Sequence, residues 1–168
     1  MKNIAFLLFI ILCDGIYAQD KFDIVSAEIS FTFVSNKVEG TLSGFSSSST
    51  LDLDNLETSE FIGSVAVESI KTGNFLRDWS LKNGKYFDAD EYPKITFESS
   101  SIAKTDNGLT LTGQLTIKDI SKEITIAFIQ LKNQLIGTLT LFSSDYAIQI
   151  KKKRTDNKVV IQVVLELE

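Results

Sequence analysis

The sequence predicts an all-β fold of antiparallel strands, and three observations support this prediction. Apolar and polar residues alternate along most of the chain, the connections between the alternating stretches are short, and turn-forming residues occupy those connections. A sheet of long strands with one apolar face must close on itself or pack against a second sheet. We therefore expect a barrel or a two-layered sheet.

Six stretches carry the alternation and predict the buried face of the sheet. In each of them every second residue is apolar or glycine, and most residues between are polar. The expected inward positions are Val25, Ala27, Ile29, Phe31 and Phe33; Phe61, Val65 and Val67; Leu109, Leu111, Gly113, Leu115 and Ile117; Ile124, Ile126 and Phe128; Leu135, Gly137, Leu139 and Leu141; and Val159, Ile161, Val163, Leu165 and Leu167.

Tight connections are predicted between consecutive strands, which favours an antiparallel meander. At residues 106–108 the sequence is Asp-Asn-Gly, and we expect the Asn-Gly pair to supply the positive φ of a tight hairpin. Further short links are expected at residues 35–36, 119–122, 132–133 and 155–157.

Residues 71–93 interrupt the strand pattern. Asn74 suits a helix N-cap and Gly84 suits the C′ position, so a short helix is expected near residues 74–83. This helix would offer Phe75, Leu76 and Trp79 for burial.

The first 18 residues have the pattern of a signal peptide. Lys2 precedes an apolar run at residues 4–13, and Ala18 followed by Gln19 suits a cleavage point. The run is shorter than the roughly 20 residues that span a bilayer. We expect a mature domain at residues 19–168 that is periplasmic or secreted. A transmembrane anchor and a lipoprotein attached through Cys13 are the alternatives.

The composition argues against several classes of function. The net charge is −5 and histidine is absent, which makes nucleic acid a poor partner. Cys13, the single cysteine, leaves with the signal peptide. Catalytic pairs and zinc sites built on histidine or cysteine are therefore excluded. We predict no enzyme activity, no metal and no cofactor.

Residues 69–102 resemble the signature region of the YceI-like family, and the similarity covers nearly all of the expected mature chain. The shared residues are Thr72, Gly73, Asn74, Arg77, Asp78, Leu81, Phe87, Asp88, Tyr92, Pro93, Ile95, Thr96 and Phe97, and downstream Leu111, Thr112, Gly113, Leu115, Thr116, Ile117 and Ile124.

This resemblance implies an extended lipocalin-like β-barrel of about eight strands, exported from the cytoplasm. It also implies a polyisoprenoid, an isoprenoid quinone or a similar long-chain amphiphile inside the barrel. Two family histidines are replaced here, by Ala27 in the first strand and by Ser80 in the helical insert. The polar headgroup of a ligand would therefore meet a different environment.

The inward faces of the strands and the helical insert supply the candidate ligand-binding residues. These are Phe31, Phe33, Leu42, Val65, Val67, Phe75, Trp79, Phe87, Ile95, Phe97, Leu111, Leu115, Phe128 and Leu139, with Arg77 as a polar contact. The alternative is that the apolar residues only fill a core, that the insert is a plug, and that Arg77 and Asp78 pair structurally. Gly40, Gly44, Gly63, Gly113 and Gly137 leave room in the lumen or mark bends.

The leading hypothesis is an exported carrier for a long apolar ligand, monomeric or homodimeric. A filled barrel that serves as an interaction or stress-related module is the first alternative. An isoprenoid-modifying enzyme centred on Arg77 and Asp88 is the second. The basic run at residues 151–154 is either a solvated turn or a contact for anionic lipid headgroups.

Overall fold

The computed structural model describes residues 21–49, 51–52 and 55–168, so the expected signal peptide lies outside the described residues. The strands are β1 (Lys21–Phe22), β2 (Ile24–Phe33), β3 (Val38–Leu42), β4 (Ser46–Ser47), β5 (Leu51–Asp52), β6 (Ile62–Ala66), β7 (Lys94–Thr105), β8 (Gly108–Ile117), β9 (Ile120–Leu131), β10 (Gln134–Phe142) and β11 (Lys158–Leu167). The helices are α1 (Phe75–Lys82) and the short 3₁₀ turns η1 (Val34–Asn36), η2 (Leu56–Thr58), η3 (Val67–Ser69), η4 (Ser143–Tyr146) and η5 (Arg154–Asn157).

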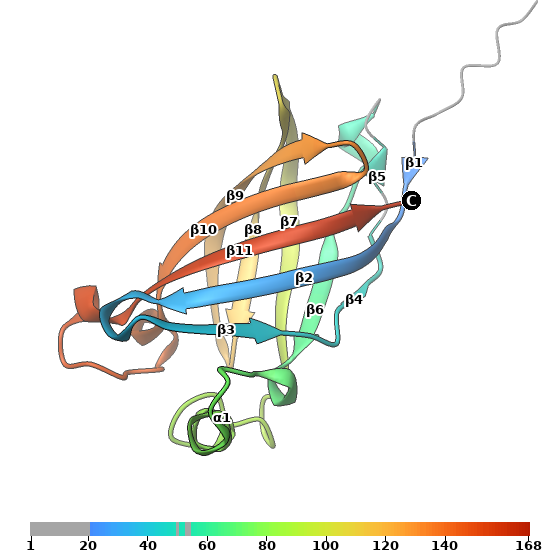
Figure 1. Cartoon of the computed structure of the whole chain (residues 1–168). Helices are drawn as coiled ribbons and strands as arrows, with labels where there is room; N and C mark the ends of the chain where they lie inside the picture. Colours follow the sequence, from blue (N-terminus) through green and yellow to red (C-terminus); the bar gives the residue numbers. More distant parts are fainter. Residues whose placement is uncertain (1–20, 50, 53–54) are drawn as a thin grey trace, which may run out of the picture.

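One antiparallel sheet of nine strands forms the body of the molecule, in the order β3-β2-β11-β10-β9-β8-β7-β6-β4. The sheet curls into a half-barrel, with α1 at one end and the small β1-β5 sheet near the other (Figure 1). The prediction of an all-β antiparallel barrel with one short helical insert is confirmed, with nine strands in the sheet instead of about eight.

The two edges of the curled sheet meet through a short backbone link. Thr41 on β3 and Lys71 exchange two hydrogen bonds, N–H to O, of 2.9 and 3.1 Å. The amide of Ala66 on β6 donates to the carbonyl of Ser43 at 3.2 Å, and the Ser69 hydroxyl bridges to the same carbonyl at 2.9 Å. These bonds satisfy part of the edge strands and hold the barrel wall together between β3 and η3.

Phenylalanine rings cover two of the glycines that face inward. Phe31 is paired with Gly40 and Phe128 with Gly137 in neighbouring strands. A Cβ atom added to Gly40 would lie 2.3 Å from the Phe31 ring, and one added to Gly137 would lie 2.7 Å from the Phe128 ring. The expectation that these glycines leave room in the lumen is wrong, because the opposing rings take the space.

A bulge shifts the inward face at the start of β2. The register between β2 and β11 slips between Glu166 and Leu167, which pair with Ser26 and Ile24. Ile24 is consequently buried, whereas Val25 is 53% exposed. The expected inward position of Val25 is therefore wrong, since one inserted residue reverses the alternation. The other five stretches face inward as predicted.

The turn residues differ from the sequence prediction in two ways. The positive φ angles of tight hairpins occur at Lys118 (φ 59°) and Lys132 (φ 56°), and not in the Asn-Gly pair at 107–108. The helix ends at Asn83 in an extended conformation, and Gly84 has no positive φ. Gly108 is nevertheless required, because an added Cβ would lie 2.1 Å from the Phe128 carbonyl oxygen.

The last two strands are joined by a long loop, residues 143–157, instead of the short turn expected at residues 155–157. Asn157 is fully buried and organises this loop. Its Oδ1 accepts from the amides of Ile150 and Lys151 at 2.9 and 2.8 Å. Its Nδ2 donates to the carbonyls of Lys151 and Lys153 at 2.9 and 2.8 Å. One buried amide thereby fixes the backbone of the basic run.

Replacement of Gly40 by alanine should destabilise the barrel. The new Cβ would lie 2.7 Å from the Lys71 carbonyl oxygen as well as against Phe31, so the link between the edges must shift. We expect a loss of about 1–3 kcal/mol in the free energy of unfolding, measured by urea titration.

Gly84→Ala is the matched control, because its nearest neighbour would be 3.5 Å away. We expect a change within about 0.5 kcal/mol for this variant. Equal losses in both variants would show that the close approach at Gly40 is unimportant.

Candidate functional site: an apolar cavity beneath helix α1

Four segments surround one end of the barrel, which is called the mouth below. They are η1, the helix α1, residues 83–93 that follow it, and the loop at residues 143–157 (Figure 1). The hairpins β7-β8 and β9-β10 and the C-terminus lie toward the opposite end (Figure 1). The mouth is therefore the end at which the irregular and helical segments gather.

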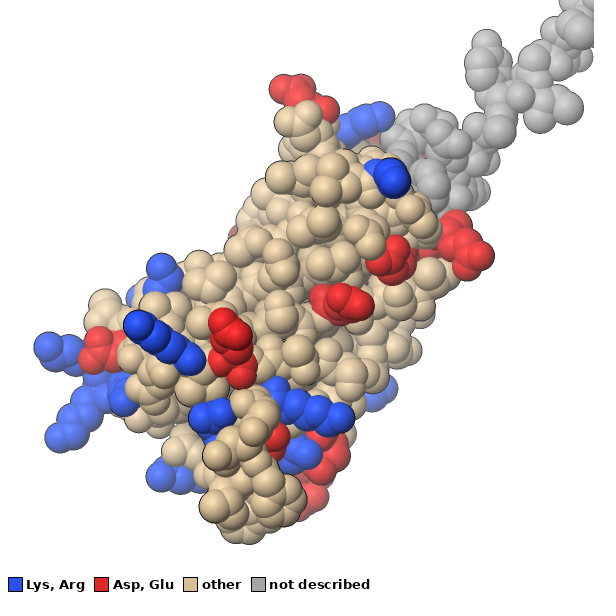
Figure 2. Space-filling model, in the orientation of Figure 1, with Lys and Arg blue, Asp and Glu red and all other residues tan. Residues whose placement is uncertain are grey.

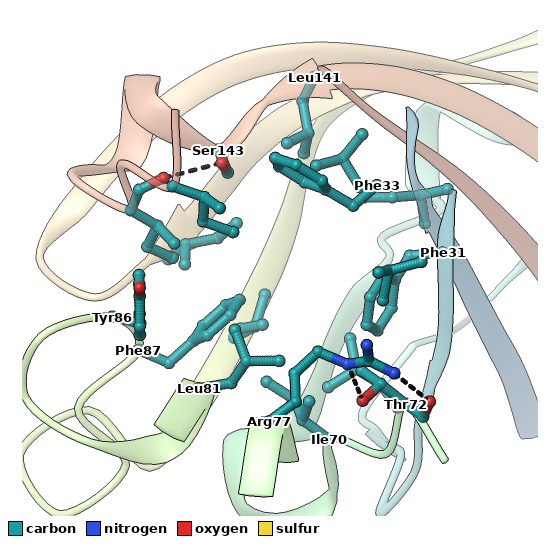
Figure 3. A pocket seen from close by; sticks show the side chains of 18 of the residues that line it. Phe31, Phe33, Ile70, Thr72, Arg77, Leu81, Tyr86, Phe87, Leu141 and Ser143 are labelled. Carbon is teal, nitrogen blue, oxygen red and sulfur yellow. Dashed lines mark hydrogen bonds between the residues drawn. The ribbon is translucent and has the colours of Figure 1, made fainter. Parts of the chain in front are cut away.

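A cavity of about 300 Å³ lies inside the mouth. This volume is at the lower end of the range, about 300–1,000 Å³, typical of small-molecule sites. Figure 3 shows Phe31 and Phe33 projecting from β2 toward Phe87 and Leu81 on the other side. The lining is Phe31, Phe33, Asn36, Val38, Leu42, Ile70, Thr72, Arg77, Ser80, Leu81, Tyr86, Phe87, Ile95, Ile117, Leu141, Ser143, Ile148, Ile150, Val159 and Ile161.

A second cavity of about 120 Å³ lies deeper in the barrel, and it is called the inner cavity below. Its lining surface is wholly apolar, because Ser64 and Thr96, the two polar residues beside it, alternate with the inward residues Gly63, Val65, Ile95 and Phe97. Four side chains line both cavities and form the boundary between them: Leu42, Ile95, Ile117 and Ile161. The two spaces thus follow each other along the barrel axis, with aliphatic groups between them.

Beyond the inner cavity, closely buried side chains of the described residues occupy the lumen. Leu51, Leu109 and Leu135 are buried to 1% exposure or less, and none of them lines either cavity. Ile24 and Leu167 are also buried without lining a cavity. The barrel is therefore hollow toward the mouth and sealed at the other end.

The structure places most candidate residues around these two cavities. Phe31, Phe33, Phe87 and Arg77 line the mouth cavity, and Leu42 and Ile95 line both. The inner cavity is lined by Val65, Phe97, Leu111, Leu115, Phe128 and Leu139. Val67 is buried but lines neither cavity. Gly63 also lines the inner cavity.

The expectation that Phe75, Leu76 and Trp79 are buried is wrong. They are 80%, 72% and 61% exposed, and Phe75 and Trp79 line neither cavity. The opposite face of α1 points inward with Arg77, Ser80 and Leu81. The sequence could not choose between these faces, because an eight-residue helix carries apolar residues on both.

Hydrogen bonds to Thr72 fix which face of α1 turns inward. Arg77 donates from Nε to the Thr72 hydroxyl at 2.6 Å and from Nη2 to the Thr72 carbonyl at 2.8 Å (Figure 3). Asp78 Oδ1 accepts from the Thr72 amide at 2.8 Å and from its hydroxyl. Asn74 caps the helix by accepting from the Arg77 amide at 3.0 Å, as predicted. Arg77 and Asp78 therefore interact through Thr72, not with each other.

Several lining residues were not identified from the sequence. Ile70, Tyr86, Ile148 and Ile150 lie in irregular segments, where no periodicity marks an inward position. Leu81 could have been found, because it lies one helical turn from Arg77 on the same face. Ser80 also lines the mouth cavity, whereas Ala27 lines neither cavity.

An ion pair and a buried phenol hold the loop at residues 143–157 next to the cavity. Arg154 donates to both carboxylate oxygens of Asp145, at 2.7 and 2.6 Å, and its guanidinium carbon lies 3.9 Å from the centre of the Phe142 ring. This bidentate contact lowers the pKa of the Asp145 carboxyl below its usual value. Burial, aided by the charge of Asp145, raises the pKa of Tyr146 to about 12.

The fold is a curled antiparallel sheet around an apolar lumen, which is hollow toward one end and filled with side chains at the other. This arrangement defines a lipocalin-like barrel. The chain belongs to the YceI-like family, whose model matches residues 21–167. A UPF0312 protein of Staphylococcus aureus strain N315 is 35% identical over 112 residues, which is 67% of this chain and 60% of the relative. The relative from strain USA300 is 32% identical over the same length. The matched part of this chain thus spans about 60% of the length of these relatives.

Solved structures show the same fold. BcnA of Burkholderia cenocepacia has a TM-score of 0.73 at 23% identity, over 88% of this chain and 99% of that chain. The Campylobacter jejuni YCEI protein has a TM-score of 0.65 at 22% identity, over 78% and 85%. A polyisoprenoid binding domain from Saccharophagus degradans, implicated in plant cell wall breakdown, has a TM-score of 0.61 at 12% identity, over 88% and 97%.

The described part of the chain lacks two further features. It contains no helix long and apolar enough to cross a bilayer. It also contains no group of three or more acidic, histidine or cysteine side chains placed to hold a metal ion.

Two leucines on β10 provide a test of where the barrel is hollow. Leu135 is fully buried among side chains, so Leu135→Ala should cost about 2–5 kcal/mol of unfolding free energy in the ligand-free protein. Leu139 borders the inner cavity and therefore faces empty space on one side, so Leu139→Ala should cost about 1–2 kcal/mol. Equal costs in denaturant titration would show that the lumen at Leu139 is filled.

Stability should fall in alkaline solution because of Tyr146. The folded pKa is raised from 10.0 to about 12, so the unfolded chain loses this proton first as the pH rises. The stabilisation is complete below about pH 10, and about 1 kcal/mol should be lost by about pH 11. Tyr146→Phe should lose less stability than the wild type between pH 9 and 11, as measured by urea titration at about these two pH values. Parallel pH profiles would contradict this assignment.

Proposed function

We propose that the protein is an exported carrier that binds a long-chain apolar amphiphile, such as a polyisoprenoid or an isoprenoid quinone, along the barrel lumen. The observation that carries this proposal is the succession of two apolar cavities, sealed beyond the inner one by Leu51, Leu109 and Leu135. A side-chain-filled interaction module would not contain this space. The signal-peptide pattern at residues 1–18 supports export.

The family and the similar structures support the same class of ligand. The chain belongs to the YceI-like family, and one protein of the same fold is a polyisoprenoid binding domain. The two lumen spaces suit a slim, extended molecule, because aliphatic side chains line the boundary between them. Binding would then follow from removal of the chain from water, at about 0.8 kcal/mol for each buried methylene.

The polar end of the ligand would lie at the mouth. All charged and most polar lining groups belong to the mouth cavity: Asn36, Thr72, Arg77, Ser80, Tyr86 and Ser143. Arg77 uses Nε and Nη2 on Thr72, while its Nη1 has no hydrogen-bond partner among the described residues. We assign Nη1 of Arg77 to a ligand oxygen, a role that suits a guanidinium. Ser80 takes the family histidine position and supplies a hydroxyl there.

We infer binding rather than catalysis from the same lining. The polar groups of the mouth cavity include neither a histidine nor a cysteine, and the hydroxyls of Thr72 and Ser143 are engaged in structural hydrogen bonds. Enzymatic activity thus has less support than a ligand-carrier function.

A bulky residue at the boundary between the cavities should shorten the ligand that is bound. In Ile161→Trp and Ile117→Phe the new ring would close access to the inner cavity. Protein purified from its own host and studied by native mass spectrometry should then carry shorter chains or bind long chains more weakly, at about 0.8 kcal/mol per excluded methylene.

Ile129→Trp is the control, because Ile129 is 56% exposed and lines neither cavity. It should carry the same ligand as the wild type. Wild-type protein that is consistently empty after gentle purification and solvent extraction would overturn the proposed function.

A further inference from the structure

The outer face of α1 forms an exposed apolar surface at the mouth. Phe75, Leu76 and Trp79 are 80%, 72% and 61% exposed. Their spacing of three and four residues places them on adjacent turns of one helix face. We call these three residues the α1 tip. They are the most exposed large apolar side chains of the described part of the chain, and Figure 2 shows uncharged atoms at the bottom of the view, where α1 lies.

Basic side chains lie around this end of the molecule. Lys71 and Lys85 flank α1, and Lys152 and Lys153 are exposed on the loop at residues 143–157. In Figure 2 blue atoms lie beside the α1 tip, with red atoms among them, and blue atoms predominate over the loop to the left of it. Arg154 is held by Asp145, and Asn157 fixes the backbone of the lysines, so the loop presents these charges on a defined scaffold.

The opposite end carries acidic residues. Asp23, Glu57, Glu60 and Glu168 are exposed there, near the β1-β5 sheet and the C-terminus. The chain as a whole has a net charge of −5, so an anionic surface repels it in most orientations. This charge distribution favours an approach with the mouth first.

We propose that the mouth docks on an anionic membrane surface, with the α1 tip inserted among the lipids and the lysines against the headgroups. Tryptophan is favoured at the boundary between acyl chains and headgroups, and phenylalanine and leucine bury apolar area below it. Each lysine near an anionic surface contributes about 1 kcal/mol. The proposal rests on the proposed function, because a membrane is where an apolar cargo would be collected or delivered.

A second copy of the chain fits this surface less well. Three side chains of about 150–250 Å² each give roughly 450–750 Å², whereas a stable interface buries about 800 Å² per partner. A two-fold symmetric contact would also bring the lysines of both copies together, and like charges would repel. A lipid surface places opposite charges there instead.

Docking through the α1 tip would place the cavity next to the lipid. The inner face of the same helix, at Arg77, Ser80 and Leu81, lines the mouth cavity. A ligand chain could pass between α1 and the surrounding loops without crossing water. The helix would therefore serve both surfaces, with the membrane on one face and the ligand on the other.

Trp79 makes the proposal directly measurable, because it is the only tryptophan in the chain. The purified protein, freed of bound lipid, is titrated with vesicles of phosphatidylcholine containing about one third phosphatidylglycerol, and with pure phosphatidylcholine. With the anionic vesicles, Trp79 emission should shift to the blue, and lipids brominated in the acyl chains should quench it. The shift should weaken as salt is added.

Matched substitutions distinguish vesicle binding through the α1 tip from nonspecific hydrophobic adsorption. Leu76→Ser should weaken vesicle binding about tenfold, whereas Leu131→Ser, at a 55% exposed leucine near the opposite end, should have no effect. Charge reversal in Lys152→Glu/Lys153→Glu should weaken binding by at least about tenfold. Lys132→Glu, in a hairpin turn distant from the mouth, is the control for this charge reversal and should leave vesicle binding unchanged.

The outcomes separate this proposal from the proposed function. Loss of vesicle binding in Leu76→Ser, with unchanged ligand in native mass spectrometry, supports docking, because Leu76 lines neither cavity. Absence of a blue shift and of quenching with every vesicle would overturn docking while leaving ligand binding intact. A concentration-dependent dimer that buries Trp79 without vesicles, seen by sedimentation, would overturn it as well.

Discussion

The backbone link between Thr41 and Lys71 is the contact on which the rest of the structure depends. It joins the free edge of β3 to the chain that leaves β6, and so it turns an open sheet into a wall around a lumen. Gly40 is required beside it, because a side chain there would collide with the Lys71 carbonyl and with Phe31. The next residue, Thr72, then holds Arg77 and Asp78 and fixes the orientation of α1. The same short segments therefore close the barrel and fix the position of α1 at its mouth.

Packing differs along the barrel axis, and this difference gives the fold its capacity to bind a ligand. Leucines fill the end near the β1-β5 sheet, while phenylalanines lie over Gly40 and Gly137 closer to the cavities. A ring that lies over a glycine covers the wall without extending across the lumen. The side chains of a nine-stranded sheet therefore bury an apolar face and still leave space toward the mouth.

The mouth combines an apolar interior, a small polar rim and an exterior suited to lipid. Arg77 and Ser80 on the inner face of α1 would meet a headgroup, and the α1 tip would meet a bilayer. Asn157 and the Asp145–Arg154 pair order the adjacent basic loop, so their structural role and the proposed docking role of the lysines are compatible. The carrier proposal and the docking proposal thus make use of separate side chains, which allows each to be tested alone.

The all-β architecture, the helical insert and most inward residues could be predicted from the sequence alone, because strand periodicity is a local property that burial on one face imposes. The sequence also located the central candidate residues, such as Phe31, Leu42 and Phe87. It could not determine the bulge that exposes Val25, the rings that cover the glycines, or the outward position of Phe75 and Trp79. Those features depend on which segments meet across the barrel. The hollow mouth and the sealed opposite end were likewise decided only by tertiary structure, because the volume of a lumen depends on side chains from strands that are distant in sequence.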